Sequence, residues 1–360
     1  MSYSVGSLFA GIGGICLGFN NAGASHRWAN EINKAACATY DKNFKSHTCH
    51  CKDIEDIKNP LKDLGYVDII TSGFPCQAFS IAGLRKGFND PRGNMFFETA
   101  RFINDIKPKA YLLENVKNLR SHDNGNTFKH IVEVLNDLNY SVIPFVLNSM
   151  KHGNIPQNRE RIFVVGFKNE YKHDSNKVCT KSFNINNLLK EAPLSTNITD
   201  LIEPEKQDDN LYFSDDHKYY PKLVDSMTSK SKIYQWRRHY VRENKSGVCP
   251  TLTANMGTGG HNVPLIKDNY GYRKLTHREC LRFQGFPDHF DFPEEISSAQ
   301  KYKQIGNSVV VPVVEKIAKE IIRVLDIKKQ IEIGKVKATD IKINNHELYR
   351  EMSNEELRFL

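Results

Sequence analysis

Cys76 and Glu114 are the side chains best suited to covalent, acid-assisted catalysis, because each follows or ends an apolar run. Cys76 lies in GFPCQAFS, residues 73–80, directly after the run at 67–72. A thiol attacks only as the thiolate, so a nearby positive charge must lower its pKa. Glu114 ends the run at 110–114, where burial would raise the pKa of a carboxyl and keep it protonated near neutral pH. Taken singly, each also fits a structural role, as a buried cysteine or as a helix-capping or ion-paired acid.

Two arginines in the segment 155–167 offer the positive charge that a thiolate needs. Arg159 and Arg161 are two residues apart, so an extended backbone presents both on the same side. Paired guanidinium groups there would clamp a carboxylate or a phosphate and lower the pKa of a neighbouring thiol. A solubility role on an edge strand is the alternative.

The segment SLFAGIGG, which begins at Ser7, has the composition of a loop that a ligand approaches closely. Gly11 and Gly13 permit close backbone contact, and the start of a helix favours an acceptor group. Cys16 stands where the third glycine of a dinucleotide fingerprint would fall, so that fingerprint is incomplete. Glu31 lies 20 residues after Gly11, where an acid would bind ribose hydroxyls. A plain tight turn is the alternative for the loop.

These residues need a scaffold that brings the ends of several strands together. Short apolar runs typical of strands lie at residues 4–9, 28–31, 67–72, 110–114, 142–148 and 162–167. Helix-like runs separate them, at residues 14–22, 33–44, 94–106 and 128–138. The alternation predicts an α/β fold with a doubly wound, Rossmann-like parallel sheet and a site at the carboxyl ends of its strands. Asp53 is placed to end a further strand at that edge.

The alternation stops after residue 167. Residues 168–262 have few clean periods and many Asn, Asp, Lys and Ser residues, which predicts a smaller, irregular second domain. Helical character returns at 276–283 and 309–325. The tail at 326–360 has balanced charge and predicts a last helix at 354–359, and we assign it no function.

Composition narrows the class of protein. The chain has 360 residues, 39% hydrophobic and 26% charged, which suffices for a folded core. It has no run of about 18 apolar residues, so we expect no membrane helix. The first residues lack the basic and apolar pattern of a secretory signal. A net charge of +8 admits a polyanionic partner.

The eight cysteines are too sparse for a disulfide scaffold, and without a signal they favour a reducing cytoplasm. His47, Cys49, His50 and Cys51 look like metal ligands at first. They lack a second paired half at zinc-finger spacing, so we interpret them as a polar turn and expect no metal.

Residues 218–245 have the composition of a nucleic-acid-binding face. This stretch contains eight basic residues, among them Arg237 and Arg238, and only two acidic ones. Five aromatic residues are interleaved, namely Tyr219, Tyr220, Tyr234, Trp236 and Tyr240. Basic and aromatic side chains together suit contact with phosphates and bases. A solvated basic surface is the alternative.

The motifs from residue 7 to about residue 325 resemble, in their order, the cytosine-carbon-5 DNA methyltransferases of bacterial restriction–modification systems. The similarity rests on six blocks: the glycine loop, Pro-Cys-Gln at 75–77, Glu-Asn-Val at 114–116, Gln-x-Arg-x-Arg at 157–161, and the segments 278–287 and 304–312. Six blocks in one order are far more specific than any single block.

The resemblance implies S-adenosylmethionine as cofactor and gives a role to each matched residue. It implies a cofactor site made by Phe9, Gly11, Gly13, Glu31, Ile32, Asp53, Ile54, Pro75, Asn307 and Val309. It implies catalysis by Cys76, Glu114, Asn115, Arg159 and Arg161. It implies contact with DNA by Gln77, Ser80, Arg237, Arg238 and Thr253.

The resemblance also implies a reaction sequence. Thiolate Cys76 adds to carbon 6 of cytosine and makes carbon 5 enamine-like, while Glu114 hydrogen-bonds or protonates nitrogen 3. Asn115 and the arginines hold Glu114 and the base, with Arg161 at the base edge. After methyl transfer a base removes the carbon 5 proton and Cys76 is eliminated. The target base must leave the duplex, because its ring atoms are inaccessible inside it.

Domains and partners follow from the same resemblance. We expect a catalytic and cofactor domain made of residues 1–167 and 305–325, and a target-recognition domain at 168–304 with glycine-rich residues at 256–260. We expect a cytoplasmic monomer that acts on double-stranded DNA, with a restriction endonuclease acting separately.

Three other functions fit part of the sequence. A tRNA cytosine-5 methyltransferase of the same fold would carry a Cys-Phe-Thr tripeptide, which this sequence lacks. A lapsed enzyme that only binds DNA would have no need of intact Cys76, Glu114, Arg159 and Arg161. A nicotinamide dehydrogenase lacks its third glycine here and leaves the Pro-Cys and Glu-Asn-Val blocks unexplained.

Overall fold

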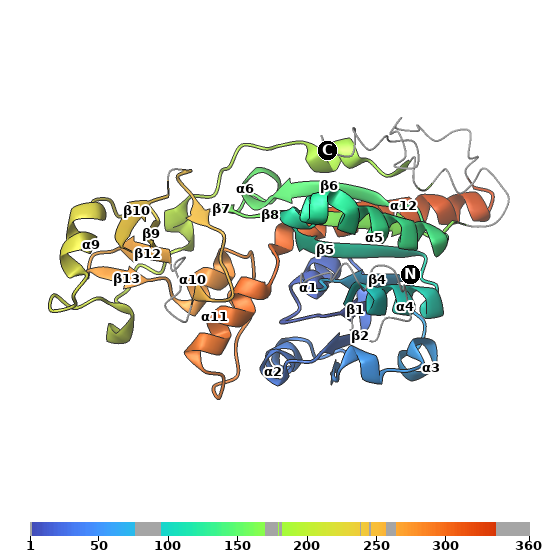
Figure 1. Cartoon of the computed structure of the whole chain (residues 1–360), viewed down its shortest axis with the longest axis horizontal. Helices are drawn as coiled ribbons and strands as arrows, with labels where there is room; N and C mark the ends of the chain where they lie inside the picture. Colours follow the sequence, from blue (N-terminus) through green and yellow to red (C-terminus); the bar gives the residue numbers. More distant parts are fainter. Residues whose placement is uncertain are drawn as a thin grey trace.

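The computed structural model describes residues 2–75, 95–169, 179, 182–237, 239–244, 246–256 and 264–335. They form two lobes, with a seven-stranded sheet in the larger and a four-stranded sheet in the smaller (Figure 1). The predictions for Cys76, Gln77, Ser80 and Arg238 and for a helix at 354–359 lie outside the described residues.

The larger sheet has the order β3-β2-β1-β4-β5-β8-β6. Its strands are β1 (Ser4–Leu8), β2 (Ser25–Glu31), β3 (Cys49–Cys51), β4 (Ile69–Ser72), β5 (Ala110–Val116), β6 (Ile143–Asn148) and β8 (Glu160–Phe167). Its helices are α1 (Gly14–Asn21), α2 (Lys34–Asn43), α3 (Pro60–Leu64), α4 (Met95–Ile106), α5 (Asn126–Asp137), α6 (Ser149–His152), α8 (Ile185–Leu189) and α12 (Val311–Glu332). The predicted doubly wound α/β sheet is confirmed.

One strand departs from the predicted parallel sheet. β8 runs antiparallel to both of its neighbours, β5 and β6. Residues 149–159 join β6 to β8, and this connection is shorter than the dozen or more residues that a parallel crossover needs. The chain therefore turns back beside β6 instead of crossing over the sheet.

Helices cover both faces of the larger sheet because its strands are apolar on both sides. Successive residues of β4, Ile69 and Ile70, are fully buried and enter two different hydrophobic cores. α1 and α12 contribute to one core, and α4 and α5 to the other. Strands buried on both faces show continuous apolar runs, which is why the sequence revealed them.

β3 is a correction to the predicted polar turn at the His47–Cys51 cluster. Cys49 and Cys51 belong to this edge strand, which pairs in parallel with the end of β2. Main-chain pairing with β2 decides the local structure, although the strand has only three residues. Within the described part of the chain, no group of three or more His, Cys, Asp or Glu side chains is arranged to hold a metal ion.

The smaller lobe contains the sheet β10-β9-β12-β13, which the sequence did not reveal. Its elements are α9 (Tyr220–Ser226), β9 (Tyr234–Arg237), β10 (Tyr240–Glu243), β12 (Pro264–Lys267) and β13 (Tyr272–Lys274). Leu223, Tyr234 and Leu265 belong to its separate hydrophobic core. The strands have three or four residues each, too few to show a clear alternation.

α10 (His277–Arg282) and α11 (Ser298–Asn307) lie between the two sheets (Figure 1). Their core contains Cys280 and Ile305 together with Ile12 and Tyr40 of the larger lobe. The short strand β11 (Cys249–Pro250) pairs with β7 (Gln157–Asn158) at the same junction. One hydrophobic core therefore spans the junction of the lobes, beside the separate core of the smaller lobe.

Two predicted boundaries differ from the packing. Phe183 and Leu188 lie in the core formed with α12, so this part of the irregular segment packs on the larger sheet. α12 continues to Glu332, past the predicted helix end at residue 325. None of the described helices combines the length and apolar character needed to cross a membrane. The remaining elements are short 3-10 helices: η1 (Ile54–Asp56), η3 (Lys117–Arg120), η4 (His122–Gly125), η5 (Ile198–Leu201) and η6 (Asp209–Leu211).

Candidate active site

The carboxyl ends of β1, β4 and β5 converge at one edge of the larger sheet. A Cβ atom placed on Gly73, directly after β4, would lie 3.6 Å from Oε2 of Glu114 and 4.0 Å from the carbonyl oxygen of Phe9. The glycine loop, the segment that leads to Cys76 and the Glu114 carboxylate therefore meet. β1 and β4 are neighbours at the point where the strand order reverses, which is the usual ligand position in such sheets.

Glu114 and Arg161 form a largely buried ion pair on adjacent strands. Arg161 Nε lies 3.0 Å from Glu114 Oε1, with 17% and 11% of the two side chains exposed. Burial raises the pKa of the Glu114 carboxyl, while Arg161 and then Arg159 oppose the shift. Burial also lowers the pKa of the Arg161 guanidinium, against the effect of Glu114. Glu114 is thus a carboxyl that takes up a proton more readily than an exposed one.

Arg159 does not share the carboxylate with Arg161, contrary to the predicted clamp. Its guanidinium donates to the carbonyl oxygens of Leu252 (2.8 Å), Gly306 (3.2 Å) and Ser308. Arg159 lies between β7 and β8, where the chain changes its pairing from β11 to β5 and β6. The segment is therefore not one regular strand, and the same-side rule fails. Arg159 is still close enough to Glu114 to act on its pKa.

The Asn115 side chain supports the entrance to the Cys76 segment, because its hydrogen bonds go to Phe74 and Val116 and not to the Glu114 carboxylate. Its side-chain amide donates to the carbonyl oxygen of Phe74 at 2.9 Å, and its side-chain oxygen accepts from the backbone of Val116. Successive residues of β5 alternate in direction, so Asn115 points away from Glu114. Asn115 is 4% exposed, which gives this hydrogen bond a buried setting.

The glycine loop and Glu31 form one structural unit. Glu31 Oε2 accepts the backbone N–H of Gly11 at 2.9 Å, and Oε1 accepts that of Asn33 at the same distance. Gly11 has φ 56°, and a Cβ atom placed on it would meet nothing within 4 Å, so space remains open beside the loop. Ile32 follows with 61% of its surface exposed. An acid with an apolar surface next to it fits a nucleoside group.

The residues after β3 occupy the next strand end. Asp53 caps η1 by accepting the backbone N–H of Glu55 at 3.0 Å. Ile54 is 3% exposed, and its carbonyl oxygen accepts from Arg101 of α4. Asp53 is therefore held by a fixed turn, while Ile54 contributes packing. Pro75, the last described residue before Cys76, is exposed.

The block 304–312 closes against the glycine loop. A Cβ atom on Gly14, which opens α1, would lie 2.4 Å from Ser308 Oγ and 3.0 Å from Val309 Cγ2. Asn307 is exposed and Val309 is 5% exposed. A side chain at the start of α1 would displace Ser308 and Val309, so Gly14 keeps the last block close to the glycine loop, in line with what the resemblance implies.

The residues predicted to contact DNA lie on separate segments. Arg237 ends β9, and its Nε atom is buried without a hydrogen-bond partner among the described atoms. Thr253 follows β11 and donates its hydroxyl to Asn255 at 2.6 Å. The rings of Tyr219 and Trp236 are 4.2 Å apart, and Lys218 lies over Tyr219.

Some of the basic side chains in the stretch 218–245 have acceptors within the fold. Lys232 pairs with Glu243 at 2.8 Å, and Lys230 bonds Asn269. Lys222 donates to the carbonyl oxygen of His239 at 2.7 Å. Part of the stretch therefore matches the alternative of a solvated basic surface.

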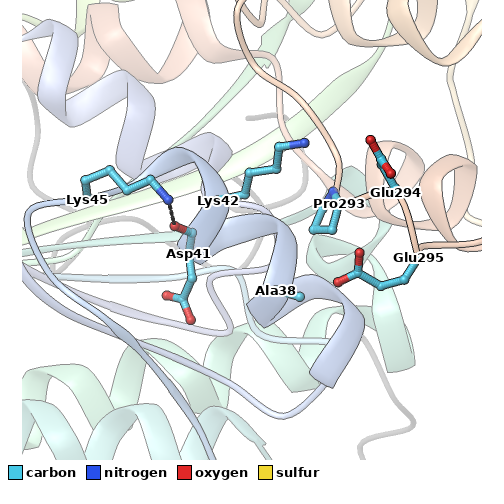
Figure 2. A pocket seen from close by; sticks show the side chains of 7 residues that line it. All are labelled: Ala38, Asp41, Lys42, Lys45, Pro293, Glu294 and Glu295. Atoms are coloured by element: carbon cyan, nitrogen blue, oxygen red, sulfur yellow. Dashed lines mark hydrogen bonds between the residues drawn. The ribbon is translucent and has the colours of Figure 1, made fainter.

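A pocket of about 560 Å³ lies between α2 and the segment at 293–295 (Figure 2). Charged side chains dominate its lining, which consists of Ala38, Asp41, Lys42, Lys45, Pro293, Glu294 and Glu295. Lys42 pairs at its edge with Asp291 at 2.7 Å. None of the residues predicted for catalysis or cofactor binding lines this pocket.

Three positions lie within the motif blocks of the sequence but were given no individual role there. Gly73 provides the close approach to Glu114, and its only signal was its place at a strand end. Gln157 is fully buried and bonds both Leu252 and Phe283, as the first residue of the Gln-x-Arg-x-Arg block. Gly306 packs against the main chain of Thr253, and its signal was a glycine in a helix.

Solved structures of similar fold include the Dnmt2 methyltransferase of S. pombe, with a TM-score of 0.69 and 21% identity over 90% of this chain and 99% of that one. A putative DNA modification methyltransferase from an E. coli prophage gives a TM-score of 0.63 at 23% identity, over 90% and 100%. The fold is that of the Rossmann-like methyltransferases.

A family model described as C-5 cytosine-specific DNA methylase matches residues 3–323. The chain is 52% identical over 322 residues to the Type II methyltransferase M.Bsp6I of Bacillus sp. (strain RFL6), covering 88% of this chain and 98% of that protein. It is 38% identical over 316 residues to the Type II methyltransferase M.HhaI of Haemophilus parahaemolyticus, covering 86% and 91%. The chain belongs to the C-5 cytosine-specific DNA methylases and is a DNA cytosine-5 methyltransferase, so the tRNA alternative is not favoured.

Proposed function

We propose that this enzyme uses S-adenosylmethionine to methylate cytosine within a specific sequence of double-stranded DNA, with Cys76 as the nucleophile. The observation that carries the proposal is the meeting of Phe9, Gly73 and Glu114 at one strand edge. This meeting of the glycine loop, the entry to Cys76 and a buried carboxyl supports a site for one small substrate ring.

The geometry at the glycine loop fits the nucleoside part of S-adenosylmethionine. Glu31 offers carboxylate oxygens for ribose hydroxyls, and exposed Ile32 offers an apolar surface for a base. Asp53 has one side-chain oxygen engaged in its cap and lies at the next strand end, near an adenine position. When bound, S-adenosylmethionine supplies an electrophilic methyl group. We assign Phe9, Gly11, Gly13, Ile54, Pro75, Asn307 and Val309 to the walls of the same site.

The protein's own groups account for the activation of the cytosine ring. The Cys76 thiolate adds to carbon 6, which places the displaced electron density on the ring. Glu114 donates a proton or hydrogen bond to nitrogen 3, so that charge does not accumulate there. Arg161 holds the Glu114 carboxyl and lies beside the base edge, and Asn115 holds the Phe74 carbonyl before the Cys76 segment. The cytosine is flipped out of the duplex to reach these groups.

The test is transfer of labelled methyl groups to mixed DNA and RNA, followed by trapping on DNA that contains 5-fluorocytosine. Fluorine at carbon 5 replaces the proton that must be removed, so the covalent adduct persists. We expect label in DNA and a trapped adduct that disappears in Cys76→Ala, while DNA binding remains. Label in RNA alone, or an adduct that survives in Cys76→Ala, would contradict the proposal.

We propose further that the smaller lobe reads the target sequence, within the domain assigned to residues 168–304. The Tyr219–Trp236 ring pair and Arg237 support this role, together with Thr253 beside the junction. Gln77, Ser80 and Arg238 complete the proposed DNA contacts. Replacing residues 203–274 with the same segment of a related enzyme should change the methylated site, as read by bisulfite sequencing. An unchanged site would refute the assignment.

The similarity to Type II methyltransferases supports a protective role beside a separate restriction endonuclease. We propose that the enzyme works as a monomer in the cytoplasm, because each strand of a short site is methylated in a separate event. Analytical ultracentrifugation with a DNA duplex checks the stoichiometry, and one protein per duplex is the expected result.

A further inference from the structure

Three chain segments meet around Arg159, and each belongs to a different part of the proposed function. The first leads into β8 and Arg161. The second, residues 249–256, runs from β11 along the junction of the lobes. The third, residues 305–309, closes over the glycine loop. Arg159 is 3% exposed at their centre.

The second segment is fastened to the first by main-chain and side-chain hydrogen bonds. The backbone N–H of Cys249 donates to the Pro156 carbonyl at 2.7 Å, and the Leu252 N–H donates to Gln157 Oε1 at 3.0 Å. The Thr251 hydroxyl donates to the Asn158 carbonyl at 2.6 Å. The segment is thus held along its length up to Leu252.

The Arg159 guanidinium joins the second segment to the third. Nη1 donates to the Leu252 carbonyl at 2.8 Å, and Nη2 donates to the carbonyls of Gly306, at 3.2 Å, and Ser308. Gly306 and Ser308 lie at the end of α11, where unpaired carbonyls favour a positive charge. The planar, forked guanidinium bonds the two segments from two different nitrogens, whereas a lysine would have to bond both from one nitrogen at the end of a flexible stem.

Gly306 brings the same two segments into direct contact. A Cβ atom on Gly306 would lie 2.2 Å from the carbonyl carbon of Thr253 and 2.5 Å from the Ala254 nitrogen. Both obstacles are main-chain atoms, so neither can rotate away. Movement of residues 305–309 therefore displaces residues 249–256, because main-chain atoms packed this closely leave no free space between the two segments.

We propose that Arg159 is a positioning residue that couples residues 249–256, on the DNA side, to residues 305–309, on the methyl-donor side. Binding of DNA and binding of the donor then strengthen each other. The inference rests on the proposed function for the roles of the two segments. The coupling is reciprocal by thermodynamic necessity, so either ligand can serve to measure it.

The test measures the affinity for S-adenosylhomocysteine by equilibrium dialysis, with and without saturating unmethylated plasmid DNA. This probe avoids turnover. We expect DNA to tighten binding in the wild type by at least about 5-fold, the lower end of ordinary coupling. In Arg159→Lys we expect this ratio to fall close to one, although each ligand alone still binds. In Gly306→Ala, which wedges the segments apart and keeps Arg159, we expect the same loss.

Arg323→Lys is the matched control. Arg323 also bonds a main-chain carbonyl, that of Ser182, but on the outer helix α12 away from the junction. In Arg323→Lys, the ratio of S-adenosylhomocysteine affinities with and without DNA should equal that of the wild type. A wild-type ratio of one, or an unchanged ratio in both Arg159→Lys and Gly306→Ala, overturns the coupling role. Failure of the wild type to bind either ligand would count against the proposed function instead. If Arg159→Lys does not fold, Gly306→Ala alone decides.

Discussion

Glu114 combines two opposing influences on its charge. Burial favours the protonated carboxyl, while Arg161 at 3.0 Å favours the carboxylate. The net shift raises the pKa, so burial prevails. A group poised in this way can donate a hydrogen bond to a ring nitrogen and later accept the proton back. The arginine therefore orients the carboxyl while lowering its pKa by less than burial raises it.

The raised pKa of Glu114 makes stability depend on pH. The folded state binds this proton more tightly than the unfolded state, so the stabilising effect is fully present below the unfolded pKa. It is lost as pH rises through the folded pKa. Relative to Glu114→Gln, the wild type should therefore lose free energy of unfolding as pH increases through that window. Urea unfolding of both proteins at a series of pH values measures the difference, and a difference that grows in the opposite direction would contradict the shift.

At the scale of elements, the strands of the larger sheet were the most predictable feature. Apolar residues at 69–70 and 110–113 face cores on both sides of the sheet, and such runs need no knowledge of their neighbours. The positions of the glycine loop and Glu31 were also predictable. The loop lies between a strand and a helix, and Glu31 follows Gly11 by the 20 residues expected for an acid at the end of the next strand. Burial, turn residues and spacing are local properties, and the sequence displays them directly.

Features that depend on distant partners were not predictable. β9 and β12 have four residues each and are stabilised by pairing with each other across residues 238–263. The direction of β8 depends on the length of its connection to β6. The carbonyl partners of Arg159 lie 93 to 149 positions away in the chain. Nothing local to these residues encodes such contacts.

The contact between α1 and α12 yields a prediction for helix packing. A Cβ atom on Gly18 would lie 2.7 Å from Val314 Cγ1 and 3.0 Å from the Glu315 backbone nitrogen. Gly18→Ala gains about 1 kcal/mol of helix propensity but forces the helices apart. Overpacking costs about 1–3 kcal/mol, and the Glu315 main chain cannot rotate away, so we expect the upper end of this cost and a net loss of about 2 kcal/mol. Urea unfolding measures it, and adding Val314→Ala should recover part of the loss. Gly18→Ala as stable as the wild type would show that the helices adjust freely.

At the scale of the whole molecule, a buried ion pair fastens the smaller lobe to the junction. Arg273 of β13 and Glu279 of α10 are both fully buried and lie 2.7 Å apart. Asp268 adds a second carboxylate at 2.6 Å from Arg273. Glu279 also accepts the backbone N–H of Glu203, so three segments share this cluster. A charge network of this kind fixes geometry, because each member is costly to leave alone.

Breaking that network should destabilise the junction strongly. Arg273→Met leaves Glu279 buried without its cation, at an expected cost of about 3–5 kcal/mol. Arg282→Met is the control, because Arg282 pairs with a largely exposed Asp288 and such pairs contribute about 0–1 kcal/mol. Chemical unfolding with tryptophan fluorescence follows both variants, and Trp236 reports on the smaller lobe. Equal losses in the two variants would contradict the importance of burial here.

The place of α12 in the chain has a consequence for how the protein is made. α12 covers the same sheet face as α1, yet it is the last described helix, ending at Glu332. During synthesis, some 300 further residues must be added after Phe19 before α12, which packs over Phe19 and its neighbours, has left the ribosome. At about 5–20 residues per second this takes roughly 15–60 s. The nascent chain therefore carries an open apolar face through most of its translation, and chaperones have that long to shield it.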